Sequence, residues 1–216
     1  TVAIRMPSHP IAQDLLNKLD FPLVAPSANR FKHISPTKPS HVFDSLGAGV
    51  PIIDGGECKL GLESTIVGFE DHGRPVVYRQ GTISLESLQE VLPETYLLNQ
   101  ELDSERIIVA PGMIKRHYAP NTPLRIVDSI EKHLEEFGSE NKIGVIYKTE
   151  TKPHPLAAQT IALSRGGDLN EIAEKLYAAF HQLDKQNLDY LIIEPFENIG
   201  LGRTLNDKIS RASSED

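Results

Sequence analysis

The feature that most constrains the fold is the alternation of strand-like and helix-like segments in the C-terminal part of the chain. The strongest helical segment is Asp168–Gln186, where apolar residues recur at helical spacing. Asp168 can cap its first turn, and Glu171, three residues later, completes a capping box. Strands are expected at Lys142–Lys148 and at Tyr190–Glu194. This alternation favours a three-layer α/β unit built around a parallel sheet.

The same periodicity defines the remaining elements of the C-terminal part. Leu124–Val127 is predicted to be a strand and Ile130–Phe137 a helix. The residues expected to form the buried stripe of the long helix are Leu169, Ile172, Leu176, Phe180 and Leu183.

The N-terminal part carries shorter strand signals that are separated by turn residues. Ile11–Leu19 has the spacing of a helix, and a second helix is expected to begin near Ser84. A turn is predicted at Asp71-His72-Gly73. The predicted strands are Thr1–Arg5, Pro22–Ala25, Val50–Asp54, Ser64–Phe69 and Val76–Arg79.

Residues 98–123 have the composition of a linker. They lack an amphipathic period and contain Pro111-Gly112, Pro120 and Pro123. Within them, Lys115-Arg116-His117-Tyr118 fits either an exposed strap or a mobile flap. We therefore expect three parts: residues 1–97, a linker or lid at 98–123, and residues 124–216.

Composition bounds the class of function. The chain has 216 residues and a formal net charge of −8, which argues against a protein that coats nucleic acid but allows a local anion pocket. Cys58 is the only cysteine, so neither a disulfide nor a cysteine zinc site forms within one chain, and the reducing cytoplasm is the expected compartment. The apolar runs are too short to cross a bilayer, so no membrane association is expected.

Several common catalytic motifs are absent from the sequence. It has no phosphate-binding loop of the Gly-x-x-x-x-Gly-Lys-Ser/Thr type, no His-Glu-x-x-His helix and no Gly-x-Ser-x-Gly elbow. Gly200-Leu-Gly202 lacks the third glycine of a dinucleotide fingerprint and is expected to lie in a loop. An activated nucleophile is therefore not indicated.

Three segments are candidates for binding chemistry. Ala25-Pro-Ser-Ala-Asn29 and Ser35-Pro-Thr37 offer hydroxyls, an amide and backbone N–H groups to an anion, although the same residues are common in ordinary turns. Gly61-Leu-Glu-Ser-Thr65 places two hydroxyls at a strand start. Arg79 precedes a glycine-containing turn and can reach a phosphate or carboxylate, although most such arginines lie on the surface.

Taken in order, these segments resemble the Sua5/YrdC family. The resemblance covers essentially the whole chain. It rests on Thr1-Val-Ala-Ile-Arg5-x-Pro7-x-His9-Pro10, Ala25–Asn29, Ser35–Thr37 with His41-Val42, Asp54-Gly-Gly56, Gly61–Thr65, Arg79-x-Gly81, Pro111-Gly-Met113 with Arg116–Pro120, Gly200–Gly202 and Asn206–Ala212.

The resemblance implies a fold and a reaction. The fold would be a partial YrdC-like twisted open sheet domain, then a lid, then a small Rossmann-like three-layer α/β Sua5 domain. The activity would be L-threonylcarbamoyladenylate synthesis from L-threonine, bicarbonate and ATP, with Mg²⁺, for the N6-threonylcarbamoyladenosine modification of tRNA. tRNA or other tRNA-modification proteins would be partners. Catalysis would depend on positioning, without a covalent intermediate or a protein metal site.

The resemblance also implies residue roles. Arg5 would pair with the threonine carboxylate, and Ala25, Ser64 and Thr65 would help to hold the amino acid. The residues implied to contact ATP are Thr1, Ser27, Asn29, Ser35, Arg79 and, from the linker, Tyr118.

The chain departs from the family pattern in two ways. Lys32 stands where the family commonly has Gly, Gly68 where it has Asp and Gln80 where it has Pro. The N-terminal half of the family's YrdC domain, with its basic Lys-Arg motif, has no counterpart, so the chain is expected to be a fragment. Two alternatives stay open: a non-catalytic nucleotide- or RNA-binding module, and a carbamoyltransferase that uses a YrdC-like domain.

Overall fold

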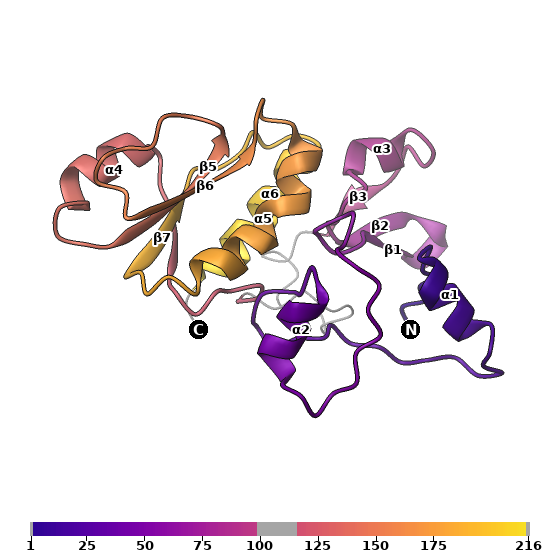
Figure 1. The fold of residues 1–216 in the computed structure, drawn as a ribbon. Coiled ribbons are helices and arrows are strands. Elements are labelled where there is room, and N and C mark those ends of the chain that lie inside the picture. Colours follow the sequence, from indigo (N-terminus) through magenta and orange to yellow (C-terminus); the bar gives the residue numbers. More distant parts are fainter. Residues whose placement is uncertain (1, 99–115, 215–216) are drawn as a thin grey trace.

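The computed structural model describes residues 2–98 and 116–214, which form two parts with a sheet each (Figure 1). The N-terminal part contains α1 (Pro10–Leu16), α2 (Pro39–Leu46), β1 (Ile66–Phe69), the 3-10 turn η1 (Asp71–Gly73), β2 (Pro75–Arg79), α3 (Leu85–Gln89) and β3 (Tyr96–Leu97). The C-terminal part contains β4 (Leu124–Ile126), α4 (Ile130–Phe137), β5 (Ile143–Thr149), β6 (Gln159–Ser164), α5 (Leu169–Leu183), β7 (Tyr190–Ile193) and α6 (Leu201–Ser213).

The C-terminal sheet has the strand order β4-β7-β5-β6, and its neighbouring strands are parallel. Alternate residues of its strands point to opposite faces. Ile146 and Ile193 pack in the cluster that includes α5 and α6, whereas Val145 and Ile192 pack in the cluster that includes α4. The predicted three-layer α/β unit is therefore confirmed.

Helix α5 forms where its pattern predicts, but its first turn differs from the predicted capping box. The Asp168 carboxylate accepts hydrogen bonds from the backbone N–H groups of Asn170 and Glu171, at 2.8 and 3.0 Å. The backbone N–H of Asp168, however, donates to Ser164 Oγ at 3.0 Å. A hydrogen bond from Ser164 lowers the pKa of Glu171, whose carboxylate thus turns to β6. The prediction that Asp168 caps the helix is confirmed. The second hydrogen bond of the capping box, from the backbone N–H of Asp168 to the Glu171 side chain, does not form, because that N–H donates to Ser164 instead.

Sequence patterns missed four elements. Gly200 to Gly202, expected in a loop, begin α6: Gly200 is its N-cap, with φ of 54°. Helix α2 begins with Pro39 in its first turn, a favoured position for proline. Strands β3 and β6 were also not predicted; β3 has only two residues, and the burial along β6 does not alternate.

The N-terminal sheet has the order β1-β2-β3, with β1 and β2 antiparallel and β2 and β3 parallel. The predicted hairpin around residues 71–73 is confirmed. The strands predicted at Thr1–Arg5, Pro22–Ala25 and Val50–Asp54 are wrong over the described residues 2–5, 22–25 and 50–54, which form no strand. A strand needs a neighbour for its backbone hydrogen bonds, and these segments have none in the described part of the chain.

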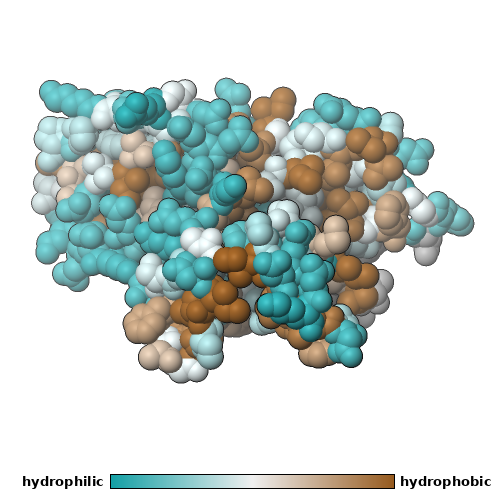
Figure 2. Space-filling view, turned by 45° about the vertical axis from the view of Figure 1, so that its right-hand side comes forward, coloured by the Kyte–Doolittle hydropathy of each residue, from teal (hydrophilic) through white to brown (hydrophobic). Residues whose placement is uncertain are grey.

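These unpaired segments expose large apolar side chains. Figure 2 shows hydrophobic residues gathered at the lower centre and on the right of the molecule, whereas the upper left is mostly hydrophilic. Contiguous exposed apolar surface is typical of interaction sites and ligand-binding grooves. The most exposed large apolar side chains of these segments are Val2, Ile4 and Val24.

The two parts share one core. Ile34, Leu62 and Tyr118 belong to the same buried cluster as the inner faces of α5 and α6. The backbone at Gly61 lies so close to α5 that a Cβ there would sit 2.1 Å from the carbonyl oxygen of Glu174. The N-terminal part therefore packs directly against the outer helices of the C-terminal unit.

Within the described ranges, no helix is both long enough and apolar enough to cross a membrane.

Lys32 has a φ of 69°, in the left-handed region that favours glycine. Its carbonyl accepts a hydrogen bond from the backbone N–H of Ala119, at 3.0 Å, which ties this turn to the linker. We predict that Lys32→Gly leaves the free energy of unfolding unchanged or raises it. Glycine relieves the backbone strain of the folded state, and this gain offsets the greater conformational entropy that glycine gives to the unfolded chain. Lys32→Val should lower the free energy of unfolding by roughly 1–2 kcal/mol, because a β-branched residue fits this conformation poorly.

Urea unfolding of the three proteins measures both effects. Lys38→Val is the matched control, since Lys38 has an extended backbone with φ of −153° that tolerates valine. Equal losses for Lys32→Val and Lys38→Val would contradict the prediction.

Candidate functional site at the junction of the two parts

Arg79, the last residue of β2, is buried and holds the segment that precedes β1. Its Nε and Nη2 atoms donate to the carbonyl oxygen of Ser64 at 3.1 and 3.0 Å, and Nη2 also lies 3.3 Å from Ser64 Oγ. A planar guanidinium gives such a two-point contact a fixed direction. Two of the predicted site residues, which are 15 positions apart in sequence, are thus brought together.

The turn after Arg79 is held equally closely. A Cβ at Gly81 would lie 2.2 Å from the backbone nitrogen of Thr65 and 2.4 Å from the carbonyl oxygen of Glu63, so only glycine fits there. The hydroxyl of Thr65 donates to the carbonyl of Ile83 at 2.7 Å and accepts from the backbone N–H of Ile83 at 3.1 Å. Thr65 is therefore a structural link between β1 and this turn.

Glu63 connects the two parts of the molecule. Its carboxylate accepts hydrogen bonds from Ser35 Oγ at 2.5 Å and from the hydroxyl of Tyr177, on α5, at 3.0 Å. The sequence pattern around residues 61–65 contained Glu63, but no role was predicted for it. Tyr177 was also missed, because a tyrosine beside an apolar stripe has the pattern of a core residue.

Tyr118, from the linker, is buried beside this carboxylate. Its ring stacks on Tyr177 with centroids 5.6 Å apart, and the Nζ atom of Lys208, on α6, lies 4.8 Å from the Tyr118 ring centroid. Its backbone φ is 63°, a strained value for a residue with a side chain. Burial, followed by the charge of Glu63, raises the pKa of the Tyr118 hydroxyl.

Two buried polar atoms of the linker have no hydrogen-bond partner among the described residues: the Tyr118 hydroxyl and His117 Nδ1. Burial lowers the pKa of His117, so the neutral imidazole is favoured. Unsatisfied buried groups are rare and mark places where a ligand or a conformational change can supply the partner. In the described residues 116–120, the linker is half-buried or buried, which excludes an exposed strap there. Lys115, the first residue of the expected flap, lies outside the described residues.

Asn29 organises the turn that leads to Ser35. Its Nδ2 atom donates to the carbonyl oxygens of Arg30, at 2.8 Å, and His33, at 3.0 Å, while its Oδ1 atom is buried without a partner in the described part of the chain. A backbone bridge then pairs His33 with Ala119 of the linker. The turn and the linker are therefore held side by side.

Arg5, Ala25 and Ser27 are not joined to this cluster: all three are exposed and lie outside helices and strands. Ser64 is also exposed, but it is held by Arg79. Thr1 lies outside the described residues. The expectation that Arg5 and Ser27 share one pocket with Arg79 stays a prediction.

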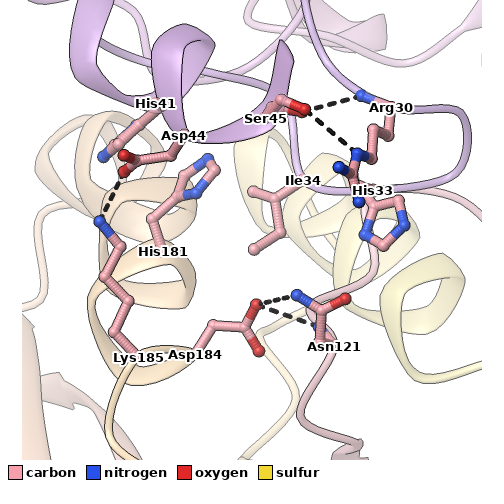
Figure 3. A pocket seen from close by; sticks show the side chains of 10 residues that line it. All are labelled: Arg30, His33, Ile34, His41, Asp44, Ser45, Asn121, His181, Asp184 and Lys185. Atoms are coloured by element: carbon pink, nitrogen blue, oxygen red, sulfur yellow. Dashed lines mark hydrogen bonds and ion pairs between the residues drawn. The ribbon is translucent and has the colours of Figure 1, made fainter. Parts of the chain in front are cut away.

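A second feature of the junction is a cleft of about 220 Å³ between α2, the linker and α5 (Figure 3). Ile34 lies between its two ends. At one end, Lys185 pairs with Asp44 at 2.6 Å; at the other, Arg30 Nε donates to the carbonyl of Ser45 at 3.1 Å. Its lining residues are Arg30, His33, Ile34, His41, Asp44, Ser45, Asn121, His181, Asp184 and Lys185.

His41 and His181 stack across this cleft, with ring centroids 3.8 Å apart. The backbone N–H of Thr37 points at His41 Nδ1, at 3.3 Å, and an N–H can only donate, so His41 Nδ1 carries the lone pair. His181 Nε2 lies 3.1 Å from the carbonyl of Ser35 and therefore carries the proton. Burial, then the neighbouring His181, lowers the pKa of His41 from 6.5 to about 4. Both rings are thus neutral at pH 7.

Among residues 2–98 and 116–214, no three His, Cys, Asp or Glu side chains gather in an arrangement that could hold a metal ion. Mg²⁺ commonly binds through one or two carboxylates together with substrate phosphates, so an ion that arrives with a nucleotide needs no such cage.

Comparison with known proteins places both parts of the chain in described families. The family described as "Threonylcarbamoyl-AMP synthase, C-terminal domain" matches residues 83–214, and the family described as "Telomere recombination", which is named for Sua5, YciO and YrdC, matches residues 1–81.

Curated relatives match almost the whole chain. It is 33% identical to the threonylcarbamoyl-AMP synthase of Bacillus subtilis, and 34% identical to those of Schizosaccharomyces pombe and Pyrococcus abyssi, each over 99% of this chain. The chain spans 63%, 57% and 64% of the lengths of these relatives, respectively.

Among solved structures, the chain is similar to that of P. abyssi Sua5 complexed with L-threonine. The TM-score is 0.82 at 32% sequence identity, and the match covers 97% of this chain and 63% of that one. A double alanine variant of P. abyssi Sua5 matches with a TM-score of 0.81 and 30% identity.

From the buried, stacked His41 and His181 we predict that the free energy of unfolding falls in acid. The folded-state pKa of His41 is about 4 and its unfolded value is 6.5. Between these values the unfolded chain binds more protons, so stability is full above about pH 6.5 and falls as the pH drops toward 4. The groups that face His41 act in both directions: Lys38, Lys185 and His181 disfavour its protonation, and Asp44 favours it.

The test compares urea midpoints at pH 7 and pH 5 for the wild type and His41→Asn. Asparagine keeps an acceptor for the Thr37 N–H but does not titrate, so the midpoint of this variant should fall less on acidification. His72→Asn, at an exposed histidine with positive φ, is the control and should behave as the wild type. An equal acid shift in all three proteins would show that the carboxylates alone set the pH dependence.

Proposed function

This chain belongs to the threonylcarbamoyl-AMP synthase family, and we propose that the intact protein makes threonylcarbamoyl-AMP and pyrophosphate from L-threonine, bicarbonate and ATP. The observation that carries the proposal is the match to curated synthases over 99% of the chain. The product would serve the N6-threonylcarbamoyladenosine modification of tRNA, with tRNA or tRNA-modification proteins as partners.

The proposed reaction needs no nucleophile from the protein. The amine of threonine and bicarbonate give a carbamate and water; a carbamate oxygen attacks the α-phosphorus of ATP, and the bond to the departing pyrophosphate breaks. Mg²⁺, where it accompanies the nucleotide, would neutralise phosphate charge. The protein contributes position and electrostatic stabilisation, and it excludes water from a mixed anhydride that hydrolyses readily.

The residue roles follow from the family resemblance and stay proposals. Arg5 would pair with the threonine carboxylate, with Ala25, Ser64 and Thr65 nearby. Ser27, Asn29, Ser35 and Thr1 would contact ATP. Because the single hydroxyl proton of Ser35 is donated to Glu63, Ser35 would donate to a phosphate oxygen only after exchanging that bond. Arg79, which orients Ser64, would stabilise phosphate charge.

The proposed division of labour follows the sequence: residues 1–97 belong to the YrdC-like catalytic domain, residues 98–123 form the lid and residues 124–216 form the Sua5 domain. The burial of Tyr118, whose hydroxyl has no hydrogen-bond partner among residues 2–98 and 116–214, supports a linker that takes part in the site.

The direct test incubates the intact protein with ATP, L-threonine and bicarbonate and follows pyrophosphate release and the adenylate product. Pyrophosphate that depends on all three substrates supports the proposal. Salt-dependent RNA binding without ATP turnover would favour the binding-module alternative, and a preference for carbamoyl phosphate over threonine would favour the carbamoyltransferase.

We predict that Arg79→Ala and Ser27→Ala each weaken ATP use by the intact protein. Loss of a charge-assisted contact costs roughly 1.5–3 kcal/mol, which corresponds to on the order of tenfold to a hundredfold in kcat/KM for ATP. Because Arg79 is buried, thermal melting must accompany the kinetics. Arg30→Ala, at an exposed arginine that lines the cleft between α2 and α5, is the control. Unchanged pyrophosphate kinetics in folded Arg79→Ala and Ser27→Ala would refute the assignment.

The lid makes a separate prediction. Trypsin cleavage after Arg116 should slow when ATP and threonine are both bound, because closure protects the backbone there. Tyr118→Ala should lower activity although Tyr118 lies outside the YrdC-like domain. Cleavage at one rate with and without ligands, together with full activity of Tyr118→Ala, would reduce the linker to a tether.

A further inference from the structure

Lys208 is fully buried on α6, with no accessible side-chain surface. Transfer of an ammonium group from water into a protein interior costs several kcal/mol unless nearby groups compensate it. Burial accordingly lowers the pKa of Lys208, while Asp207 and Glu63 act in the opposite direction. The groups that contact Lys208 must therefore compensate for the burial of its ammonium group.

Its hydrogen-bonding partner is the adjacent Asp207, whose Oδ2 atom lies 3.2 Å from Nζ. The other oxygen of Asp207 accepts from Arg211 Nε at 2.9 Å, so this carboxylate is shared between two cations one turn apart. The negative charge of Asp207 is therefore divided between the ammonium group of Lys208 and the guanidinium group of Arg211. Besides the charges of Asp207 and Glu63, Lys208 also has an aromatic partner.

That partner is Tyr118. Its ring contacts Lys208 Nζ at 4.8 Å from the centroid and stacks on Tyr177. A desolvated cation over an aromatic ring is a stronger contact than the same pair in water. One turn further along α6, the carbonyl of Arg211 accepts a hydrogen bond from the backbone N–H of His117 at 3.2 Å. Helix α6 thus contacts the linker twice, once at a ring and once at the backbone.

This double contact holds the linker in a conformation that it would not adopt unaided. Tyr118 has a φ of 63°, and its hydroxyl has no partner among the described residues. Left-handed backbone costs roughly 1–2 kcal/mol for a residue with a side chain, and an unmade buried hydrogen bond costs a comparable amount. The ring contacts with Lys208 and Tyr177 help to offset both, together with the backbone hydrogen bonds of His117 and Ala119.

We propose that Lys208 is a positioning residue: through its contact with the Tyr118 ring, it holds the linker against the cluster of Glu63, Ser35 and the Arg79–Ser64 pair. The C-terminal unit thereby sets the geometry of a site whose polar groups come mostly from the N-terminal part. The consequence for catalysis rests on the proposed function, whereas the consequence for the linker does not.

The test uses the intact protein with Lys208→Met, which keeps the length of the side chain and removes its charge. Lys175→Met, at an exposed lysine of α5, is the matched control. Trypsin cleavage after Arg116 reports the release of the linker without any substrate. Loss of the contact should speed cleavage roughly 5- to 30-fold in Lys208→Met and leave Lys175→Met at the wild-type rate.

A double-mutant cycle with Tyr118→Leu separates positioning from general stability. If Lys208 acts through the ring, Lys208→Met in the Tyr118→Leu background should add little further cleavage. Tyr118→Phe, which keeps the ring, should be cleaved at nearly the wild-type rate. Additive effects, or wild-type cleavage in a Lys208→Met protein with an unchanged melting temperature, would overturn the proposal. Lys208→Gln replaces Lys208→Met if the latter does not fold.

Kinetics extend the test to the site. In a protein that makes the adenylate, Lys208→Met should lower kcat about as much as Tyr118→Leu does, with the double variant no worse. An unaffected kcat in Lys208→Met would overturn the role in positioning. If the wild-type protein makes no adenylate, the proposed function fails, and the cleavage cycle still decides whether Lys208 holds the linker.

Discussion

The Glu63 carboxylate is the interaction on which the junction depends, because it accepts hydrogen bonds from both parts of the molecule. Ser35 donates from the N-terminal part, and Tyr177 donates from α5. Such donors offset the loss of water around a half-buried carboxylate. The backbone at Gly61 packs on α5, and the Thr204 hydroxyl donates to the carbonyl of Gly81. The position of the segment around Glu63 therefore depends on the helices of the C-terminal unit.

Sequence patterns predicted most of the C-terminal unit, because β4, α4, β5, α5 and β7 each carry their own signal, whereas β6 and α6 were missed. The stripe of α5 buries residues at a period that is visible within one segment. Three predicted N-terminal strands were wrong for the opposite reason: a run such as Val50–Asp54 becomes a strand only beside a partner. The relatives are longer than this chain, which spans about three-fifths of their length.

The residues of the candidate site were likewise predicted only in part. Arg79, Ser64, Thr65 and Ser35 were predicted from motifs that resemble a family, and the structure brings Arg79 to Ser64. Tyr177 and Lys208 were not predicted, because one adjoins an apolar stripe and the other follows an acidic residue on a helix. Such residues have no local signature; they gain a role only from what the tertiary fold places beside them. The same holds for Lys32, whose positive φ explains why glycine is common there in the family that the sequence resembles.

The charge of the whole chain does not describe this junction. The protein carries a net charge of −8, yet three cations, Arg79, Lys208 and Arg211, surround Tyr118 together with two carboxylates, Glu63 and Asp207. Burial strengthens every charge interaction there relative to the surface. Around Tyr118 the cations therefore outnumber the carboxylates, in contrast to the net charge of the whole chain. This local excess exists only because α6 brings Lys208 and Arg211 to residues of the N-terminal part, the linker and α5.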